Sequence, residues 1–407
     1  MLLPTAAQIV IILESTRDGG GVAERFDAVV VGAGPGGSTA AYRLARGGAR
    51  VLLLDRARFP RDKPCGGGLT GRALTSLPVD VSPVVEDAIT KVDLRLRFRS
   101  AITHHYDDPI ALMTQRRRLD HLLAETAAGA GADFRDGTRV RDLALDGPGG
   151  RPVVTLEGGA RIGAEVLIGA DGANGVSAKA LGLGGDRTFG VALEGNAPMT
   201  PERAAVHRGR ATLEIDTVPG GYGWIFPKGD HINVGVGGWS SEGPRMRRFL
   251  DALCAMHDVR PEELTDVRGH RLPLRRSWQG VARGRAAVVG DAAGLIDPLS
   301  GDGMFEAFLS SELATATALD LLAGRVSGME PYRWRVQRTL AGHAATAWVA
   351  RATLERLPAL TFQVLRRDAA RRFLGHRLGT RPPEVRVPLI GGVERFARRA
   401  LGPAAGA

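Results

Sequence analysis

Cysteine is scarce in this sequence: two residues among 407 exclude a framework of disulfides as the source of stability. A chain of this length buries a large apolar core without such crosslinks, and low cysteine content is typical of a reducing environment. The nine histidines show none of the spacings of a metal-binding motif. We therefore expect a cytoplasmic protein of two or three structural units, with no metal site.

Long apolar runs are lacking as well. No stretch reaches about 18 apolar residues, the length that a transmembrane helix requires. The apolar segment at residues 6–13 is too short to span a bilayer, and it lacks the basic region that begins a signal peptide. Three glycines at 19–21 separate this segment from the rest of the chain, so we expect residues 1–25 to form a disordered leader.

Lysine supplies only four of the 54 basic residues, and the basic charge is unevenly placed. Residues 331–407 contain 15 arginines against four acidic residues, a net charge of +11, whereas the remainder is nearly neutral. Such a tail suits an anionic membrane surface or a pyrophosphate-bearing substrate, although a solvated surface has the same composition. We expect no nucleic acid partner.

A basic amphipathic helix in this tail would lie in a lipid interface, which predicts peripheral contact with the inner face of the plasma membrane. Its arginines are Arg366, Arg367, Arg371, Arg372 and Arg377, among the apolar residues Phe362, Val364, Leu365, Phe373 and Leu374.

A strand–turn–helix–strand unit is predicted near the N-terminus. Apolar runs at 27–31 and 50–54 flank an alanine-rich helix at 35–46. The turn has the pattern G-x-G-x-x-G, with glycines at Gly32, Gly34, Gly36 and Gly37. Glycines allow the backbone to approach a pyrophosphate at the helix N-terminus, and Asp55 after the second strand can bind ribose hydroxyls. This unit predicts a dinucleotide site without distinguishing FAD from NAD.

Two later turns also lie directly after predicted strands. Gly290 and Asp291 end a strand at 286–289, and a long helix at 302–322 begins shortly afterwards. An aspartate in this position can hold a ribityl chain, and the helix N-terminus can stabilise negative charge on a reduced flavin. Residues 169–172, which include Asp171, form another such turn. Three turns of this kind, in this order, favour FAD.

Strand-like alternation between Phe189 and Trp239 predicts an antiparallel sheet that interrupts the parallel unit. The expected fold is α/β, with a discontinuous Rossmann-type FAD-binding domain at 26–80, 111–185 and 271–325. A substrate-binding domain at 81–110 and 186–270 is inserted into it. The last unit is a basic helical region at 326–407.

Three segments carry a resemblance to a known family: KPCGGG at 63–68, YGWIFP at 222–227, and residues 290–303. Over about residues 26–325 the chain resembles the geranylgeranyl reductase family. That family lies in the p-hydroxybenzoate hydroxylase-like branch of the glutathione reductase-type flavoproteins. Leu119 replaces the family's usual phenylalanine and Asp302 its usual glutamate, both mild departures.

The resemblance implies non-covalent FAD, reduced by a donor that stays undecided between NAD(P)H and a ferredoxin-like protein. Arg116 would reach the FAD phosphates, and Val140 would pair with adenine through its backbone. The implied cofactor residues are Gly32, Gly34, Gly36, Gly37, Asp55, Cys65, Gly66, Arg116, Val140, Asp171, Gly290, Asp291, Pro298, Gly301, Gly303 and Met304.

Two features bear on the substrate. Tyr222, Trp224 and Phe226 alternate along one predicted strand and so share a face, either as ordinary packing or as one wall of a lipophilic tunnel. Cys65 is either a proton donor or positioning group beside the flavin, or a small residue that fills a glycine-rich loop.

The resemblance predicts a reductase that saturates carbon–carbon double bonds of a lipophilic isoprenoid. Candidate substrates are geranylgeranyl or polyprenyl lipids, a quinone side chain and a terpenoid metabolite. An FAD-dependent monooxygenase or halogenase acting on a specialised metabolite is the alternative, because the fold is shared. A non-catalytic prenyl carrier is a third interpretation, against which the intact glycine turn, Asp55 and Asp291 argue.

Overall fold

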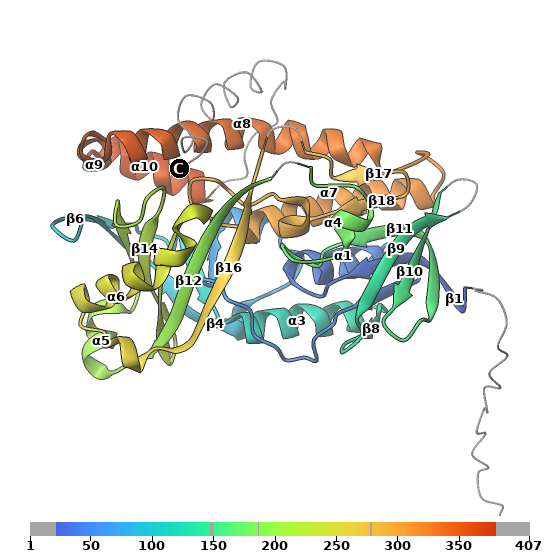
Figure 1. The fold of residues 1–407 in the computed structure, drawn as a ribbon, viewed down its shortest axis with the longest axis horizontal. Coiled ribbons are helices and arrows are strands. Elements are labelled where there is room, and N and C mark those ends of the chain that lie inside the picture. Colours follow the sequence, from blue (N-terminus) through green and yellow to red (C-terminus); the bar gives the residue numbers. More distant parts are fainter. Residues whose placement is uncertain (1–21, 147–149, 186, 277–278, 380–407) are drawn as a thin grey trace, which may run out of the picture.

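The computed structural model of the chain describes residues 22–146, 150–185, 187–276 and 279–379. These residues form an eight-stranded sheet, a seven-stranded sheet and a three-stranded sheet, with α-helices packed around them (Figure 1). Within this part of the chain, no helix is both long enough and apolar enough to cross a bilayer.

The eight-stranded sheet has the main order β17-β18-β11-β1-β2-β8, with β10 and β9 added beside β11. Its central pairs are parallel, and β2 and the second half of β1, residues 28–31, are apolar and buried, as expected for strands covered on both faces. The strands are β1 (Glu24–Val31), β2 (Val51–Leu54), β8 (Asp133–Arg135), β9 (Val140–Asp146), β10 (Arg151–Leu156), β11 (Arg161–Gly169), β17 (Ala282–Arg283) and β18 (Ala286–Val288).

Three helices pack on this sheet or on one another: α1 (Pro35–Arg46), α3 (Arg116–Gly129) and α7 (Met304–Leu322). All three lie in the half of the molecule on the right of Figure 1. Because β1, β11 and β18 are parallel, their carboxyl ends meet at one edge of the sheet. The three turns predicted from sequence therefore converge there.

The seven-stranded sheet has the order β16-β12-β15-β14-β13-β5-β6. Its strands are β5 (Lys91–Leu96), β6 (Ser100–His105), β12 (Thr188–Pro198), β13 (Arg210–Ile215), β14 (Tyr222–Lys228), β15 (His231–Trp239) and β16 (Thr265–Leu274). The predicted antiparallel strands are present, but β13 also pairs with β5 in parallel, because β5 joins the sheet from an earlier segment. Helices α5 (Pro201–His207) and α6 (Met246–Met256) pack against this sheet, and α6 buries Leu250 and Leu253.

The small sheet has the order β3-β7-β4, from β3 (Gly68–Thr70), β7 (Ala111–Thr114) and β4 (Val85–Ile89). It takes strands from both sides of the domain boundary predicted near residue 80, and the helix α2 (Gly71–Thr75) comes directly after β3. The boundaries themselves stay a prediction.

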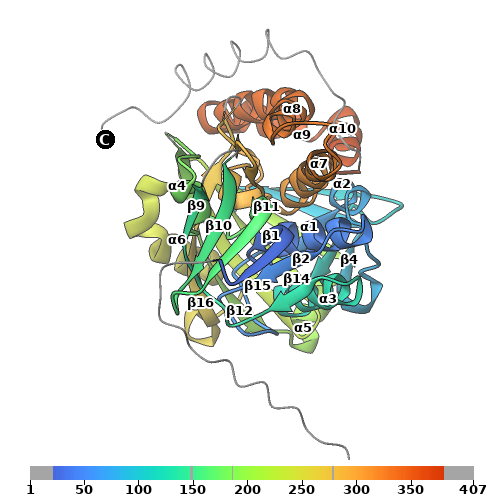
Figure 2. The ribbon, with the colours of Figure 1, turned by 90° about the vertical axis from the view of Figure 1, so that its right-hand side faces the viewer.

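Helices α8 (Glu330–Arg356), α9 (Pro358–Leu365) and α10 (Asp368–Gly379) lie along the top of the molecule (Figures 1 and 2). Phe362 of α9 is buried with Leu94 and Ile215, which fixes α9 to the seven-stranded sheet. At the other end of the chain, β1 begins at Glu24, inside the segment expected as a leader, because Glu24 pairs with β11 and forms a 2.7 Å ion pair with Arg135. Residues 1–21 lie outside the described residues.

Candidate functional site

A cavity of about 730 Å³ lies between the turns of the eight-stranded sheet and one face of the seven-stranded sheet. That volume is within the range of small-molecule and cofactor sites, about 300–1,000 Å³. Nearly all the residues predicted from sequence line it. They are Gly32, Gly34, Gly36, Asp55, Cys65, Gly66, Arg116, Val140, Asp171, Tyr222, Trp224, Phe226, Gly290, Asp291, Gly301, Gly303 and Met304. Gly37 and Pro298 are not among the lining residues.

Two positions of the glycine turn leave no room for a side chain. Gly32 has a φ of +100°, and a Cβ there would lie 2.4 Å from the Ala170 carbonyl oxygen. A Cβ on Gly37 would lie 1.7 Å from the Gly32 carbonyl oxygen, so Gly37 serves the packing of α1 against the turn. The first N–H groups of α1 have no partners within the helix and favour an anion at this end.

Two arginines bring positive charge to this turn. The Arg116 guanidinium binds Asp120 through two hydrogen bonds of 2.7 Å, and Arg61 binds the same carboxylate at 2.6 Å. Burial opposes the charge on Arg116, but Asp120 more than compensates and raises the pKa of Arg116. Both guanidinium groups lie 3.7–3.8 Å from the Cβ position of Gly34, a place suited to phosphate oxygens. Sequence reasoning missed Arg61, which belongs to no motif.

Asp55 supports the same turn. Its carboxylate accepts hydrogen bonds from the backbone N–H groups of Ala33 (2.8 Å) and Ala57 (2.9 Å) and lies 3.6 Å from Arg61. A carboxylate has further lone pairs that can accept from ribose hydroxyls. Asp171 is engaged differently, because its Oδ2 accepts three hydrogen bonds from Val176 and Ser177. The Asp171 side chain thus holds its own loop beside the cavity.

Asp291 is held by two basic residues. Its Oδ2 accepts a 2.9 Å hydrogen bond from Lys63 and lies 3.6 Å from His270 Nε2. Burial alone would raise the pKa of Asp291, but Lys63 and His270 outweigh it and lower that pKa well below its ordinary value. The site therefore presents a carboxylate where the resemblance places the ribityl chain. His270 carries no sequence signal of its own.

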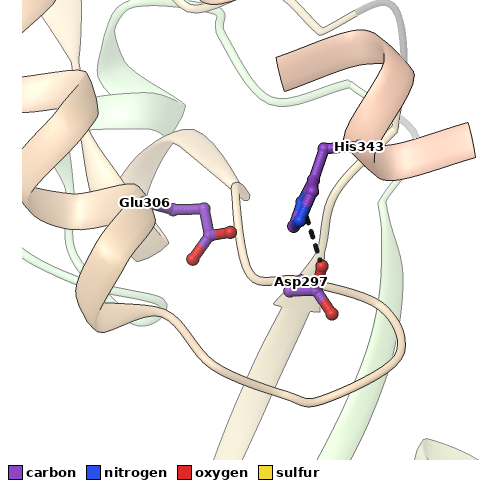
Figure 3. Close-up of side chains that lie close together, drawn as sticks. All are labelled: Asp297, Glu306 and His343. Atoms are coloured by element: carbon purple, nitrogen blue, oxygen red, sulfur yellow. Dashed lines mark ion pairs between the residues drawn. The ribbon is translucent and has the colours of Figure 1, made fainter. Parts of the chain in front are cut away.

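The turn between β18 and α7 rests on a buried polar cluster. Arg72 binds Asp302 at 3.1 Å and His343 Nε2 at 2.9 Å, while Nδ1 of His343 lies 3.5 Å from Asp297 (Figure 3). Pro298, which does not line the cavity, accepts a hydrogen bond from Arg351 at 2.7 Å. Burial raises the pKa of Glu306 well above its ordinary value, which favours the neutral form of this carboxyl group. The cluster fixes the turn that leads into α7.

Asp297, Glu306 and His343 offer ligand atoms within 4.8 Å of one another (Figure 3). Their surroundings do not favour a cation, because Arg72 and Arg377 already supply positive charge beside Asp297. The Nε2 atom of His343 is also occupied by Arg72, at 2.9 Å. The expectation of no metal site stays a prediction.

The aromatic residues of β14 form a wall of the cavity. The ring centroids of Tyr222 and Trp224 are 6.0 Å apart, and those of Trp224 and Phe226 are 6.3 Å apart. Phe226 packs 3.0 Å from the Cβ position of Gly66, and the Tyr222 hydroxyl donates to the Ser300 carbonyl. Apolar residues from four strands continue the wall: Ile89, Val92, Met113, Ala211 and Leu213.

Cys65 is half-buried at the junction of this wall and the cofactor residues. Its backbone N–H donates to Glu194 at 2.6 Å, and its carbonyl accepts from Lys228 at 2.6 Å. Its sulfur accepts from the Gly67 N–H at 3.4 Å. The loop is therefore held in place by Glu194 and Lys228, neither of which we selected from sequence.

Known proteins share this sequence pattern. A family model described as an FAD binding domain matches residues 25–215. Menaquinone reductase of Mycolicibacterium smegmatis is 35% identical over 300 residues, covering 69% of this chain and 73% of that protein. The chloroplastic geranylgeranyl diphosphate reductase of Oryza sativa is 31% identical over 328 residues, covering 75% of this chain and 68% of that protein. The chain belongs to the geranylgeranyl reductase family of FAD-dependent oxidoreductases.

Solved structures agree on the fold of this geranylgeranyl reductase family member. A geranylgeranyl bacteriochlorophyll reductase-like protein from Thermoplasma acidophilum superposes with a TM-score of 0.73 at 20% identity, covering 94% of this chain and 97% of that chain. A flavin-dependent brominase superposes with a TM-score of 0.72 at 18% identity, covering 92% and 100%. At these identities the likeness concerns the fold alone.

Proposed function

We propose that this protein saturates carbon–carbon double bonds of an isoprenoid, a geranylgeranyl or polyprenyl lipid, a quinone side chain or a terpenoid metabolite. The observation that carries the proposal is the aromatic and aliphatic wall, which is continuous with the cofactor residues in one cavity. A long apolar chain lying on this wall would exclude water from the reacting carbons. The two relatives named as menaquinone and geranylgeranyl diphosphate reductases support the same substrate class.

The cavity residues fit FAD. Arg61, Arg116 and the start of α1 would hold the pyrophosphate, Asp55 the ribose, and Asp291 the ribityl chain. When bound and reduced, the flavin supplies a hydride to one alkene carbon. The residues of the chain position the alkene and supply the proton for the other carbon. The identity of the electron donor stays open.

A monooxygenase or halogenase is the second candidate, because a brominase shares the fold. Two observations disfavour a free catalytic lysine of the halogenase kind. Lys63 is bound to Asp291, and Lys228 is bound to the Cys65 carbonyl. Anaerobic turnover decides between the candidates, since a reductase needs no oxygen.

We also propose that the C-terminal helices bind an anionic lipid bilayer from one side. Six of the nine exposed large apolar side chains among the described residues lie on or between α8, α9 and α10: Trp334, Val349, Leu357, Leu360, Val364 and Phe373. The exposed arginines Arg356, Arg366, Arg367 and Arg372 lie along the same helices. This combination of apolar and basic side chains complements anionic headgroups above acyl chains.

Two residues that were predicted to lie on the basic amphipathic face point toward the interior of the protein. Phe362 is 2% exposed because it packs against the seven-stranded sheet, and Arg377 turns inward to lie 3.5 Å from Asp297. Leu378, beside Arg377, lines the cavity. The helix that carries the exposed Phe373 thus also covers the site, which would give a membrane-borne substrate a short route to it.

A further inference from the structure

Saturating an alkene requires a proton as well as a hydride, and the cavity contains a carboxyl group suited to supply it. Six acidic residues line the cavity: Asp55, Asp62, Asp171, Glu194, Asp291 and Asp302. Five are otherwise engaged. Asp55 and Asp171 hold backbone turns, Asp291 and Asp302 are ion-paired with Lys63 and Arg72, and Asp62 lies 3.5 Å from Arg268 near solvent. Glu194 is 8% exposed and forms no ion pair within 4 Å among the described residues.

Strand register places Glu194 beside the aromatic wall. Trp224 on β14 pairs with Gly235 on β15, and Gly235 pairs with Glu194 on β12. Directly paired residues of antiparallel strands share a face of the sheet. Because Gly235 has no side chain, the Trp224 indole covers it, 2.2 Å from where a Cβ would stand. The indole and the carboxyl group therefore border the same part of the cavity.

The groups around Glu194 orient its carboxyl. Oε1 accepts the 2.6 Å hydrogen bond from the Cys65 N–H, and the Asn233 amide interacts with the carboxyl group. Asn233 in turn accepts a 2.8 Å hydrogen bond from the Trp224 indole. Burial and, to a smaller extent, the charge of Asp62 raise the pKa of Glu194, while Lys228, the Cys65 N–H and Asn233 oppose this shift in part. Arg268 is the cross-strand neighbour of Glu194 on β16. Burial thus favours the protonated form of the side chain, and the groups nearby stabilise its conjugate base.

We propose that Glu194 is the general acid of the reaction, which rests on the proposed function. The O–H bond of its carboxyl breaks as a C–H bond forms at one alkene carbon. The other carbon accepts the hydride from reduced FAD, so the alkene is reduced by two electrons and the flavin is oxidised. Glu194 remains as a carboxylate, stabilised by Lys228 and the Cys65 N–H, and regains its proton from solvent.

The decisive variant is Glu194→Gln, because the amide oxygen still accepts from the Cys65 N–H while the acidic proton is lost. Glu242→Gln is the matched control, since Glu242 is buried to a similar degree and does not line the cavity. Each protein is loaded with FAD, reduced with dithionite and mixed anaerobically with geranylgeranyl diphosphate, or with menaquinol, whose ring is already reduced and cannot oxidise the flavin, over a range of pH. Removing a general acid slows reoxidation of the flavin by about 100- to 10,000-fold.

We expect Glu194→Gln to keep its FAD and its reduction by dithionite but to reoxidise at least about 100-fold more slowly. The wild-type rate should fall as pH rises through the raised pKa of Glu194, and this alkaline decline should be absent from the variant. A wild-type rate in Glu194→Gln overturns the proposal. If Cys65→Ser loses the fast reoxidation while Glu194→Gln keeps it, the proton comes from the thiol, and the proposal is again overturned.

A measurement without substrate separates this proposal from the proposed function. Infrared difference spectra of wild type minus Glu194→Gln, recorded over a range of pH, should show the C=O band of a protonated carboxyl group that persists above the ordinary glutamate pKa of about 4.3. Absence of that band overturns the assignment of Glu194 as an acid. If the band is present but none of the prenyl substrates reoxidises the flavin of the wild-type protein, the proposed function is wrong and the assignment of Glu194 as an acid still stands.

Discussion

Lys63 and Asp291, 228 positions apart in the sequence, are joined by a 2.9 Å ion pair at the edge of the cavity. The pair links the loop that carries Cys65 to the turn that precedes α7. One contact therefore couples the position of the substrate-side loop to a carboxylate that is expected to bind the cofactor.

Breaking this pair should weaken FAD binding. In Lys63→Met, His270 is the basic partner of Asp291 that remains among the described residues, and a lost hydrogen bond to a charged group costs about 1.5–3 kcal/mol. We expect Kd for FAD to rise by about 10- to 100-fold. Lys179→Met, at an exposed lysine of the helix α4 (Ser177–Ala180), should leave Kd unchanged. Flavin fluorescence titration measures Kd for FAD in both variants. Equal Kd values would show that the ion pair does not contribute to FAD binding.

The lowered pKa of Asp291 also predicts how stability depends on pH. An unfolded aspartate has a pKa of about 3.9. Because the folded pKa is lower, the carboxylate stabilises the fold above the unfolded value, and that contribution is lost as pH falls through the folded value. Below about pH 4, urea unfolding should show wild type losing more stability per pH unit than Asp291→Asn. The exposed-site variant Asp108→Asn should behave as wild type.

A substitution at Trp224 tests whether the aromatic wall contacts substrate, and it leaves the residues expected to bind the nucleotide unchanged. Trp224→Leu removes the indole while keeping an apolar side chain, so we expect FAD content to be unchanged. KM for a long prenyl substrate should rise by about tenfold or more, corresponding to about 1–3 kcal/mol of lost apolar contact. Met256→Leu, at a 50% exposed methionine of α6, is the control and should match wild type. A normal KM in Trp224→Leu would mean that the wall does not contact substrate.

Both the fold and the site could be predicted in part from the sequence, for local reasons. The glycine turn, Asp55, Asp291 and the alternation of Tyr222 with Trp224 are defined by spacing within one or two elements. Arg61 and Glu194 gave no such signal, since each is defined by partners that lie distant in sequence. Arg377 was assigned to the surface for the same reason, because its partner Asp297 is 80 positions away.

The C-terminal surface makes a separate prediction. The double variant Leu360→Glu/Phe373→Glu places charge on two of the most exposed apolar side chains of α9 and α10, which are 58% and 61% exposed. It should co-sediment less with phosphatidylserine vesicles than wild type does. Val206→Glu, at a 55% exposed valine of α5, should bind as wild type. Equal binding of wild type to phosphatidylserine and phosphatidylcholine vesicles would contradict the proposed surface.

The central claim is that the cavity holds an isoprenoid alkene against FAD and reduces it. We would load the protein with FAD, reduce the flavin with dithionite and add, in the absence of oxygen, geranylgeranyl diphosphate or menaquinol, whose ring is already reduced. We expect flavin reoxidation together with a product that has gained two hydrogens for each double bond reduced. Reoxidation that requires oxygen, with a product that has gained an oxygen atom, would contradict it and identify a monooxygenase.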